Sequence, residues 1–308
     1  MTVVVGCTPK ESGNDALELA AMLARSTGED VVVAAVVAAA WPPSTERVDA
    51  DYRAYLAQRG EQTLAHAREW MPVDVKTTYQ LHHTASVPVG LLEQAREHDA
   101  SVLVLGSSES GGLGHVAIGS VADRIVHSSP VPVVLAPRGY QAEPEGRVRR
   151  VTVAFSGRKD RALVVSAAEY AALTGSSLRI ASFSVRPKMV FASTLAGSGE
   201  DLVVDRWSLE TRELIDEELD ELRRLPDIPR PLEVVIGDGY GWREALGNAR
   251  WSLGDLLIVG SSSHGPLASV FLGSRASKIL RHAPVPVMAL PRPGSLRAAG
   301  PPWSARPR

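Results

Sequence analysis

The sequence lacks the features that mark several classes of protein. Its 308 residues contain a single cysteine, Cys7, so no disulfide forms within the chain and a reducing cytoplasm is the expected compartment. The 33 Lys and Arg nearly balance the 35 Asp and Glu, and a net charge of -2 gives no electrostatic reason to expect nucleic acid or a membrane surface as a partner. The longest apolar run, at 31–41, is shorter than the roughly 20 residues that cross a bilayer.

Several catalytic and cofactor motifs are also absent. Neither G-x-G-x-x-G after the first apolar run nor G-x-x-x-x-G-K-[ST] occurs, which argues against a dinucleotide fingerprint and a Walker loop. The segment GSSSHG at 260–265 has His264 where a G-x-S-x-G elbow needs glycine, so a serine hydrolase is disfavoured. His82 and His83 lack metal-ligand spacing. We therefore expect neither catalysis nor a metal site.

The chain does contain an internal repeat. The segment VLVLGSSESGGLGHVAIGSVADRIVHSSPVPVVLAP resembles LLIVGSSSHGPLASVFLGSRASKILRHAPVPVMALP without a gap. An earlier match joins VVVGCTP at 3–9 to VTVAFSG at 151–157. Four pairs of landmarks in the longer segment are each 154 residues apart: Gly106 and Gly260, Gly119 and Gly273, Ser120 and Ser274, and Pro130 and Pro284.

This repeat predicts two domains, at 1–138 and 151–293. The intervening residues 139–150 are charged and contain Gly and Pro, which is typical of a linker with a boundary near residue 145. The second copy carries about six extra residues, which we assign to the turn-rich stretch at 186–200. The tail at 294–308 has several Pro and Arg and no apolar period, so we expect disorder there.

Each copy alternates short β-branched runs with helical periods, which predicts parallel strands joined by crossover helices. In the first copy we expect strands at 3–7, 31–37, 73–80, 102–105 and 131–135. Apolar residues after the first strand recur at helical spacing, and Gly28 suits the end of that helix, as Gly175 does in the second copy. Five strands and about four helices per copy indicate a doubly wound α/β fold.

One loop of each copy has the pattern of an anion site. An apolar strand ends at glycine, passes through a Ser- and Gly-containing loop, and leads into a helix at Gly-Ser. Such a loop can present backbone N–H groups and the positive end of a helix dipole to a phosphate. The alternative is purely structural, with Ser120 as the helix cap and Asp123 completing a capping-box-like pair.

These repeated segments resemble the universal stress protein family in its tandem form, over residues 1 to about 293. The resemblance implies two flavodoxin-like or Rossmann-like domains, each with a five-stranded, mainly parallel sheet, paired as an internal pseudo-dimer through their last strands. Those strands are 130–135 and 284–290, whose prolines suit edge strands. We expect the apolar face of Val133 and Leu135 to bury against that of Val287 and Ala289.

Some family members bind ATP, and their pattern resembles G-x-x-G-x9-G-[ST] together with an Asp at the end of the first strand. This chain keeps the outer positions of that pattern but has Glu109 and Ser263 in place of the second glycine. Thr8 and Ser156 stand at the Asp positions. A side chain restricts the close approach of the backbone to phosphate, and the carboxylate of Glu109 opposes it directly. We therefore expect ATP binding to be weak or absent.

If a nucleotide binds, the second copy is the expected site. Arg275 and Lys278 lie in the first helical turn there. The first copy has Val121 and Arg124 at those positions, alongside Asp123, whose charge opposes a phosphate. ATP is then the ligand that the resemblance suggests. The candidate nucleotide-binding residues are Gly106, Gly119, Ser120, Ser156, Gly260, Ser263, Gly273, Ser274 and Arg275.

The sequence thus predicts a cytoplasmic, non-catalytic stress-response module, with an adenine-nucleotide sensor as the alternative. No nucleic-acid or membrane partner is expected, and protein partners are not identified by the sequence, although the family form suggests a homodimer. On the predicted helix at 202–225, Leu209, Leu214, Leu219 and Leu222 are expected to face the core. We expect packing or interfacial roles, not ligand recognition, for Trp207, Trp242 and Trp251.

Overall fold

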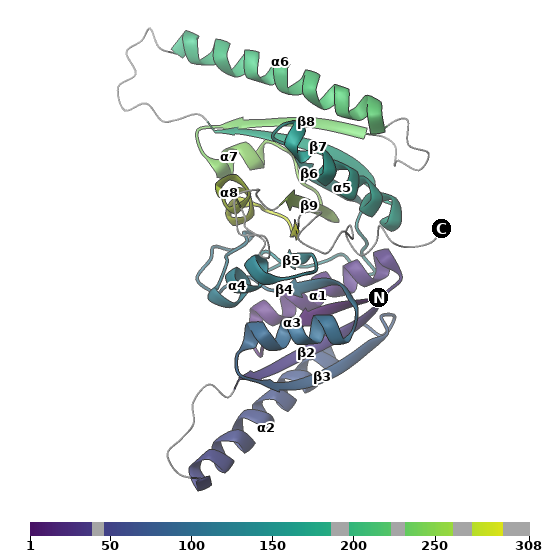
Figure 1. The fold of residues 1–308 in the computed structure, drawn as a ribbon, viewed down its shortest axis with the longest axis vertical. Coiled ribbons are helices and arrows are strands. Elements are labelled where there is room, and N and C mark those ends of the chain that lie inside the picture. The colour runs from purple at the N-terminus through teal and green to yellow at the C-terminus, as the bar shows by residue number, and fades with distance from the viewer. Residues whose placement is uncertain (39–45, 186–196, 223–231, 261–272, 292–308) are drawn as a thin grey trace.

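The computed structural model describes residues 1–38, 46–185, 197–222, 232–260 and 273–291. Figure 1 shows the elements of the two sequence copies stacked along the long axis of the molecule. The first copy contains β1 (Thr2–Gly6), α1 (Glu11–Thr27), β2 (Asp30–Ala38), α2 (Glu46–Trp70), β3 (Thr77–Thr84), α3 (Val87–Glu97), β4 (Ala100–Leu105), α4 (Ser120–Ser128) and β5 (Val133–Leu135). The second contains β6 (Arg150–Ala154), a 3₁₀ turn (Arg158–Asp160), α5 (Arg161–Thr174), β7 (Ser177–Val185), α6 (Gly197–Leu222), β8 (Leu232–Gly239), α7 (Trp242–Gly247), β9 (Asp255–Gly260), α8 (Ser274–His282) and β10 (Val287–Leu290).

The strands form one sheet in the order β3-β2-β1-β4-β5-β10-β9-β6-β7-β8. Each half therefore has the order 3-2-1-4-5, which is the Rossmann order and differs from the flavodoxin order 2-1-3-4-5. Within a half all pairs are parallel, and the halves meet through the antiparallel pair β5 and β10. The expected pair of five-stranded domains, joined through their last strands, is confirmed.

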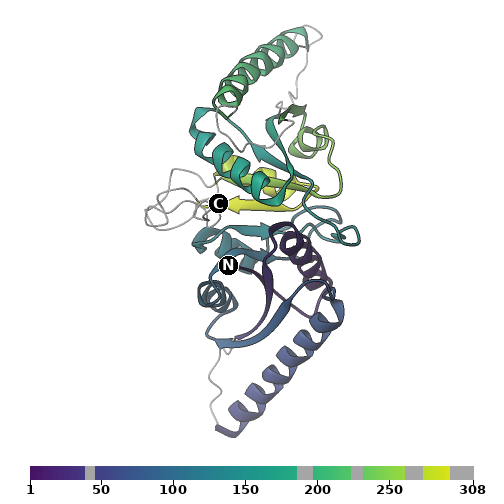
Figure 2. The ribbon, with the colours of Figure 1, turned by 90° about the vertical axis from the view of Figure 1, so that its right-hand side faces the viewer.

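The core lies in two layers, one on each face of the sheet, and both layers run through the two halves. One layer packs beneath α1, α2, α5 and α6, and it includes Val134 and Met288 from the central strands. The other packs beneath α3, α4, α7 and α8 and includes Val133, Leu135 and Val287. The last strands, β5 and β10, thus pair edge to edge, and the side chains expected to bury against each other lie in the same layer of the core. In Figure 2, α2 and α6 lie at the two far ends of this arrangement.

Local chemistry accounts for the helix ends. Gly28 and Gly175 end α1 and α5 in the left-handed conformation, with φ of 72° and 65°. Only glycine adopts that conformation without a steric penalty. The Gly28 N–H donates to the Ala24 carbonyl at 2.8 Å. Both of these predictions from the sequence are confirmed.

Two predictions about element register were wrong. The third strand runs from Thr77 to Thr84 and not over 73–80, because residues 72–75 form a turn that leaves Val73 fully exposed. On α6 the prediction is wrong for Leu209, which is 64% exposed, but it is confirmed for Leu219, which is buried, and for Leu214, which packs partly buried against the core. Ile215 is buried as well. Buried positions on this helix recur every four residues, and a residue six positions before Ile215 lies on the opposite side. The side chain of Leu222 lies outside the described set.

The segment between the copies is packed along α1. The Gly139 N–H donates to Asp15 Oδ2 at 2.9 Å, and the Tyr140 hydroxyl lies 3.1 Å from Met22 Sδ. Farther along, the Val148 N–H donates to Ser26 Oγ at 2.8 Å. The connection between the halves is therefore held against the first domain.

Candidate functional site

A cavity of about 600 Å³ opens at the carboxyl ends of the strands in the first domain. It lies at the point where the strand order reverses, between β1 and β4, which is where ligands bind in open α/β sheets. Its volume is in the range of small-molecule sites, about 300–1,000 Å³. Its walls come from the ends of β1, β2 and β4, the middle of α2 and the first turn of α4.

Gly106 lies where the β4–α4 loop comes closest to the start of α1. A Cβ atom at position 106 would lie 1.8 Å from the Ser12 carbonyl oxygen, and one at Gly13 would lie 2.2 Å from the Thr8 carbonyl oxygen. Neither contact is sterically allowed. The β4–α4 loop therefore approaches the start of α1 only because position 106 is glycine, and the β1–α1 loop packs on the first turn of α1 only because position 13 is glycine. The fold alone therefore requires Gly106.

Gly119 has no such role in the fold. Its φ of -84° is available to any residue, and a Cβ there would meet only Ser108, at 3.4 Å. Gly119 and Ser120 both line the cavity. A glycine that faces a cavity without a steric requirement leaves room for a ligand to approach the backbone.

The helix α4 directs its amino end into this cavity. It begins at Ser120 with Gly119 as its cap, and no side chain caps it. The predicted capping pair of Ser120 and Asp123 is therefore wrong, because Ser120 already lies inside the first turn. The Asp123 N–H donates to the Gly119 carbonyl at 2.9 Å. The N–H groups of the helical residues before Asp123 have no carbonyl partner within the helix. They are therefore available, together with the positive end of the helix dipole, to a ligand in the cavity.

The loop between β4 and α4 is fixed by polar contacts, of which the one from Ser107 to Ala136 is buried. The Ser107 hydroxyl donates to the Ala136 carbonyl at 2.6 Å and accepts the Ala117 N–H at 3.1 Å. Arg138 Nη1 donates to the carbonyl oxygens of Glu109 and Gly111, at 3.0 and 2.7 Å. The backbone at Glu109 is thus held in place beside the cavity.

The charged residues on the described wall of the cavity are Lys10, Arg59 and Glu109. Lys10 Nζ lies 3.0 Å from Glu109 Oε2, and both side chains are about half exposed. This ion pair joins the loop after β1 to the loop after β4. Cys7, on the same wall, is a buried thiol whose pKa burial raises to about 11, and it acts as an apolar wall residue.

The second domain has a different arrangement at the corresponding place. A cavity of about 60 Å³ lies among Ser156, Asp160, Gly260 and Arg275. The Ser156 N–H and hydroxyl both donate to Asp160 Oδ2, at 2.7 and 2.5 Å. Arg275 Nη2 donates to the Phe183 carbonyl, and burial lowers the pKa of this guanidinium. The side chain of Arg275 therefore reaches across to the end of β7.

Beyond Arg275 lies a more open groove of about 450 Å³, with Trp207, Trp242 and Lys278 on its wall and Ser274 at the start of α8. Gly273 caps α8 as Gly119 caps α4. Ser263 lies outside the described residues. Of the predicted set, Gly106, Gly119 and Ser120 share the first cavity, while Ser156, Gly260 and Arg275 share the smaller one.

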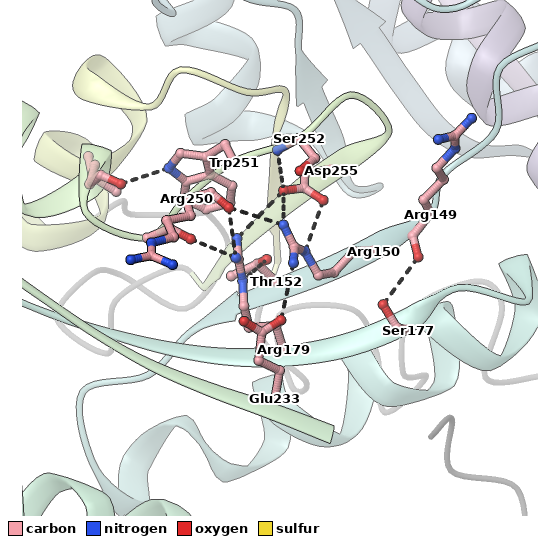
Figure 3. Close-up of polar contacts among 12 residues, drawn as sticks. Arg149, Arg150, Thr152, Ser177, Arg179, Glu233, Arg250, Trp251, Ser252 and Asp255 are labelled. Atoms are coloured by element: carbon pink, nitrogen blue, oxygen red, sulfur yellow. Dashed lines mark hydrogen bonds and ion pairs between the residues drawn. The ribbon is translucent and has the colours of Figure 1, made fainter. Parts of the chain in front are cut away.

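Sequence reasoning missed a charged cluster at the other end of the second domain, shown in Figure 3. Arg150 donates to both oxygens of Asp255, from Nε at 3.0 Å and from Nη2 at 2.6 Å. Arg179 is fully buried. Its Nη2 lies 3.7 Å from Asp255 Oδ2, and its Cζ lies 4.6 Å from the centroid of the Trp251 ring. The strands pair Thr152 with Arg179 where the first domain pairs Val4 with Val32. The cluster therefore belongs to the second domain alone.

The described residues contain no group of three or more His, Cys, Asp or Glu side chains placed to hold a metal ion. No helix within the same ranges combines the length and apolar character needed to span a membrane.

Comparison with known proteins identifies the family. The sequence profile of the universal stress protein family matches residues 1–137 and 147–291. Universal stress proteins of Mycobacterium tuberculosis and Mycobacterium bovis are each 37% identical over 298 residues, which is 94% of this chain and 100% of theirs. The crystal structure of a universal stress protein from Archaeoglobus fulgidus matches with a TM-score of 0.59 and 19% identity, over 94% of this chain and 98% of that one. The chain therefore belongs to the universal stress protein family and contains two family domains in tandem.

Proposed function

We propose that the chain is a non-catalytic, cytoplasmic stress-response module that binds a ligand of the nucleoside class in the cavity of its first domain. The observation that carries the proposal is the combination of the cavity of about 600 Å³ with the amino end of α4 and Gly119 on its wall. The size suits a nucleoside, and the helix terminus suits its phosphate.

The first domain is preferred over the second, although the basic residues of the second copy favoured that copy in the sequence. Arg275 lies across the corresponding space in the second domain and donates to the Phe183 carbonyl. The space that the described residues leave inside it, about 60 Å³, is too small for a nucleoside. The groove of about 450 Å³ beyond Arg275 is lined by the end of β7 and by helices, without β6 or β9, so it does not lie where the strand order reverses.

The proposal includes no catalytic step. Glu109, the carboxylate on the described cavity wall, is paired with Lys10. The raised pKa of Cys7 keeps its thiol protonated at neutral pH. A binding module needs neither group to be activated.

Calorimetric titration tests the proposal, with adenosine, AMP, cyclic AMP and ATP added separately to the full chain. We expect saturable binding of at least one of them and at least a tenfold loss of affinity in Gly119→Val, because the new side chain enters the space beside α4. Gly112→Val is the matched control. Position 112 is in the same loop, is not on the cavity wall, and has open space around its Cβ direction.

Absence of heat with all four ligands would contradict the proposal. So would an equal loss of binding in Gly119→Val and Gly112→Val, since that result would show a general effect on the loop. Circular dichroism of both variants establishes that they are folded.

A further inference from the structure

The Lys10–Glu109 ion pair bears on which ligand the first cavity accepts, an inference that rests on the function proposed above. We infer that this pair makes the cavity selective for nucleosides and nucleoside monophosphates over nucleoside triphosphates. Both residues lie on the cavity wall, and their charged atoms are 3.0 Å apart.

Glu109 lies on the cavity wall close to the amino end of α4. A Cβ atom at Gly119, the cap of α4, would meet the side chain of Ser108 at 3.4 Å, so the loop that carries Glu109 runs beside the helix terminus. The Glu109 carbonyl is held by Arg138 Nη1 at 3.0 Å, which limits how far the loop can withdraw. A phosphate chain growing outward from α4 therefore meets a carboxylate.

The same ion pair also neutralises a cation that a phosphate would otherwise use. Lys10 is engaged by Glu109, which leaves Arg59 as the other cation on the described wall. The wall thus carries one net positive charge, which offsets part of the charge of about -1.5 to -2 on a monophosphate. A triphosphate brings further negative charge, and to pair with Lys10 it must first displace Glu109 and then lie next to it.

The test compares dissociation constants of adenosine, AMP and ATP in the wild-type chain and in Glu109→Gln. The wild type should bind ATP at least tenfold more weakly than AMP. The substitution changes two exposed charge contacts, since it frees Lys10 and removes the repulsion, and each such contact changes affinity by up to about fivefold. Together they should tighten ATP binding by roughly tenfold and leave adenosine binding unchanged. Lys10→Gln should instead weaken AMP and ATP without altering adenosine.

Asp30→Asn provides a control of equal charge change. It frees Lys76, another exposed ion-paired lysine of the first domain, which does not line the cavity. We expect it to leave all three dissociation constants unchanged.

Equal affinity of the wild-type chain for AMP and ATP would overturn the inference while leaving nucleotide binding intact. A Glu109→Gln variant that shifts adenosine and ATP by the same factor would overturn it as well. Failure of every ligand to bind the wild type would instead remove the proposed function and the inference together.

Discussion

The buried carboxylate of Asp255 is the group whose removal should affect stability most. Its side chain is 2% exposed, and it faces Arg150 and Arg179, of which Arg179 is fully buried. Burial and the neighbouring Arg150 lower the pKa of Arg179, while the hydrogen bond to Asp255 raises that of Arg150. Asp255→Asn keeps the shape of the side chain but leaves two guanidinium groups close together without the carboxylate that holds them.

Removing one partner of a buried ion pair costs roughly 3–5 kcal/mol, because the remaining charge has no compensation. Asp255 also accepts the Ser252 N–H at 2.9 Å, which an asparagine oxygen can still do. We therefore expect the free energy of unfolding to fall by about 3–5 kcal/mol in Asp255→Asn. Urea denaturation followed by circular dichroism measures this loss.

Asp74→Asn is the matched control, because Asp74 makes the same two-pronged contact with Arg25, at 2.6 and 2.9 Å, but is itself exposed. It should cost a small fraction of the loss in Asp255→Asn.

A triple variant tests the same argument by removing Asp255 and Arg179 together. Thr152→Val, Arg179→Val and Asp255→Ser together reproduce the residues of the first domain at these positions, Val4, Val32 and Ser101. Because no charge is left unpaired in the core, the triple variant should be more stable than Asp255→Asn. A loss below about 1 kcal/mol in the single variant, or a larger loss in the triple variant, would refute the argument.

Three shorter predictions concern the first domain. Burial raises the pKa of Asp15 in the folded chain, so the folded state binds a proton on this carboxyl more tightly than the unfolded state does. The free energy of unfolding should therefore fall as pH rises from the pKa of Asp15 in the unfolded chain to its higher pKa in the folded chain. Asp15→Asn, which still accepts the Gly139 N–H, should remove this slope from urea midpoints measured between about pH 4 and 7. Cys7, with a pKa of about 11, should react with a thiol reagent at pH 8 far more slowly in the native chain than in guanidinium, and equal rates would contradict its burial. Gly106→Ala should destabilise the fold by more than about 2 kcal/mol, because its Cβ meets the Ser12 carbonyl, whereas Gly119→Ala should remain close to wild type.

The repeat made much of the fold predictable from the sequence. Glycines at fixed offsets located the two copies, and strand and helix periods located most of the elements that the structure contains. The pairing of the last strands followed from the resemblance, and β5 and β10 meet as expected. The start of β3 was not predictable because Val73 continues an apolar pattern while the turn at 72–75 exposes it.

The site was less accessible to sequence reasoning. The ion pair of Lys10 with Glu109 joins residues 99 positions apart, and nothing local indicates it. Arg179 occupies a strand position that is valine in the first copy, and only the fold shows that Thr152, Asp255 and the Ala249 carbonyl surround it. Likewise, the sequence read Arg275 as a cation available to phosphate, whereas the structure shows it bonded to the Phe183 carbonyl.

A crystal structure of the full chain grown with saturating AMP tests the central claim most directly. The account predicts AMP in the cavity of the first domain, with its phosphate within hydrogen-bond distance of the backbone N–H groups of Ser120 and Val121 at the start of α4. An empty first cavity under those conditions, or AMP bound only in the second domain, would contradict it.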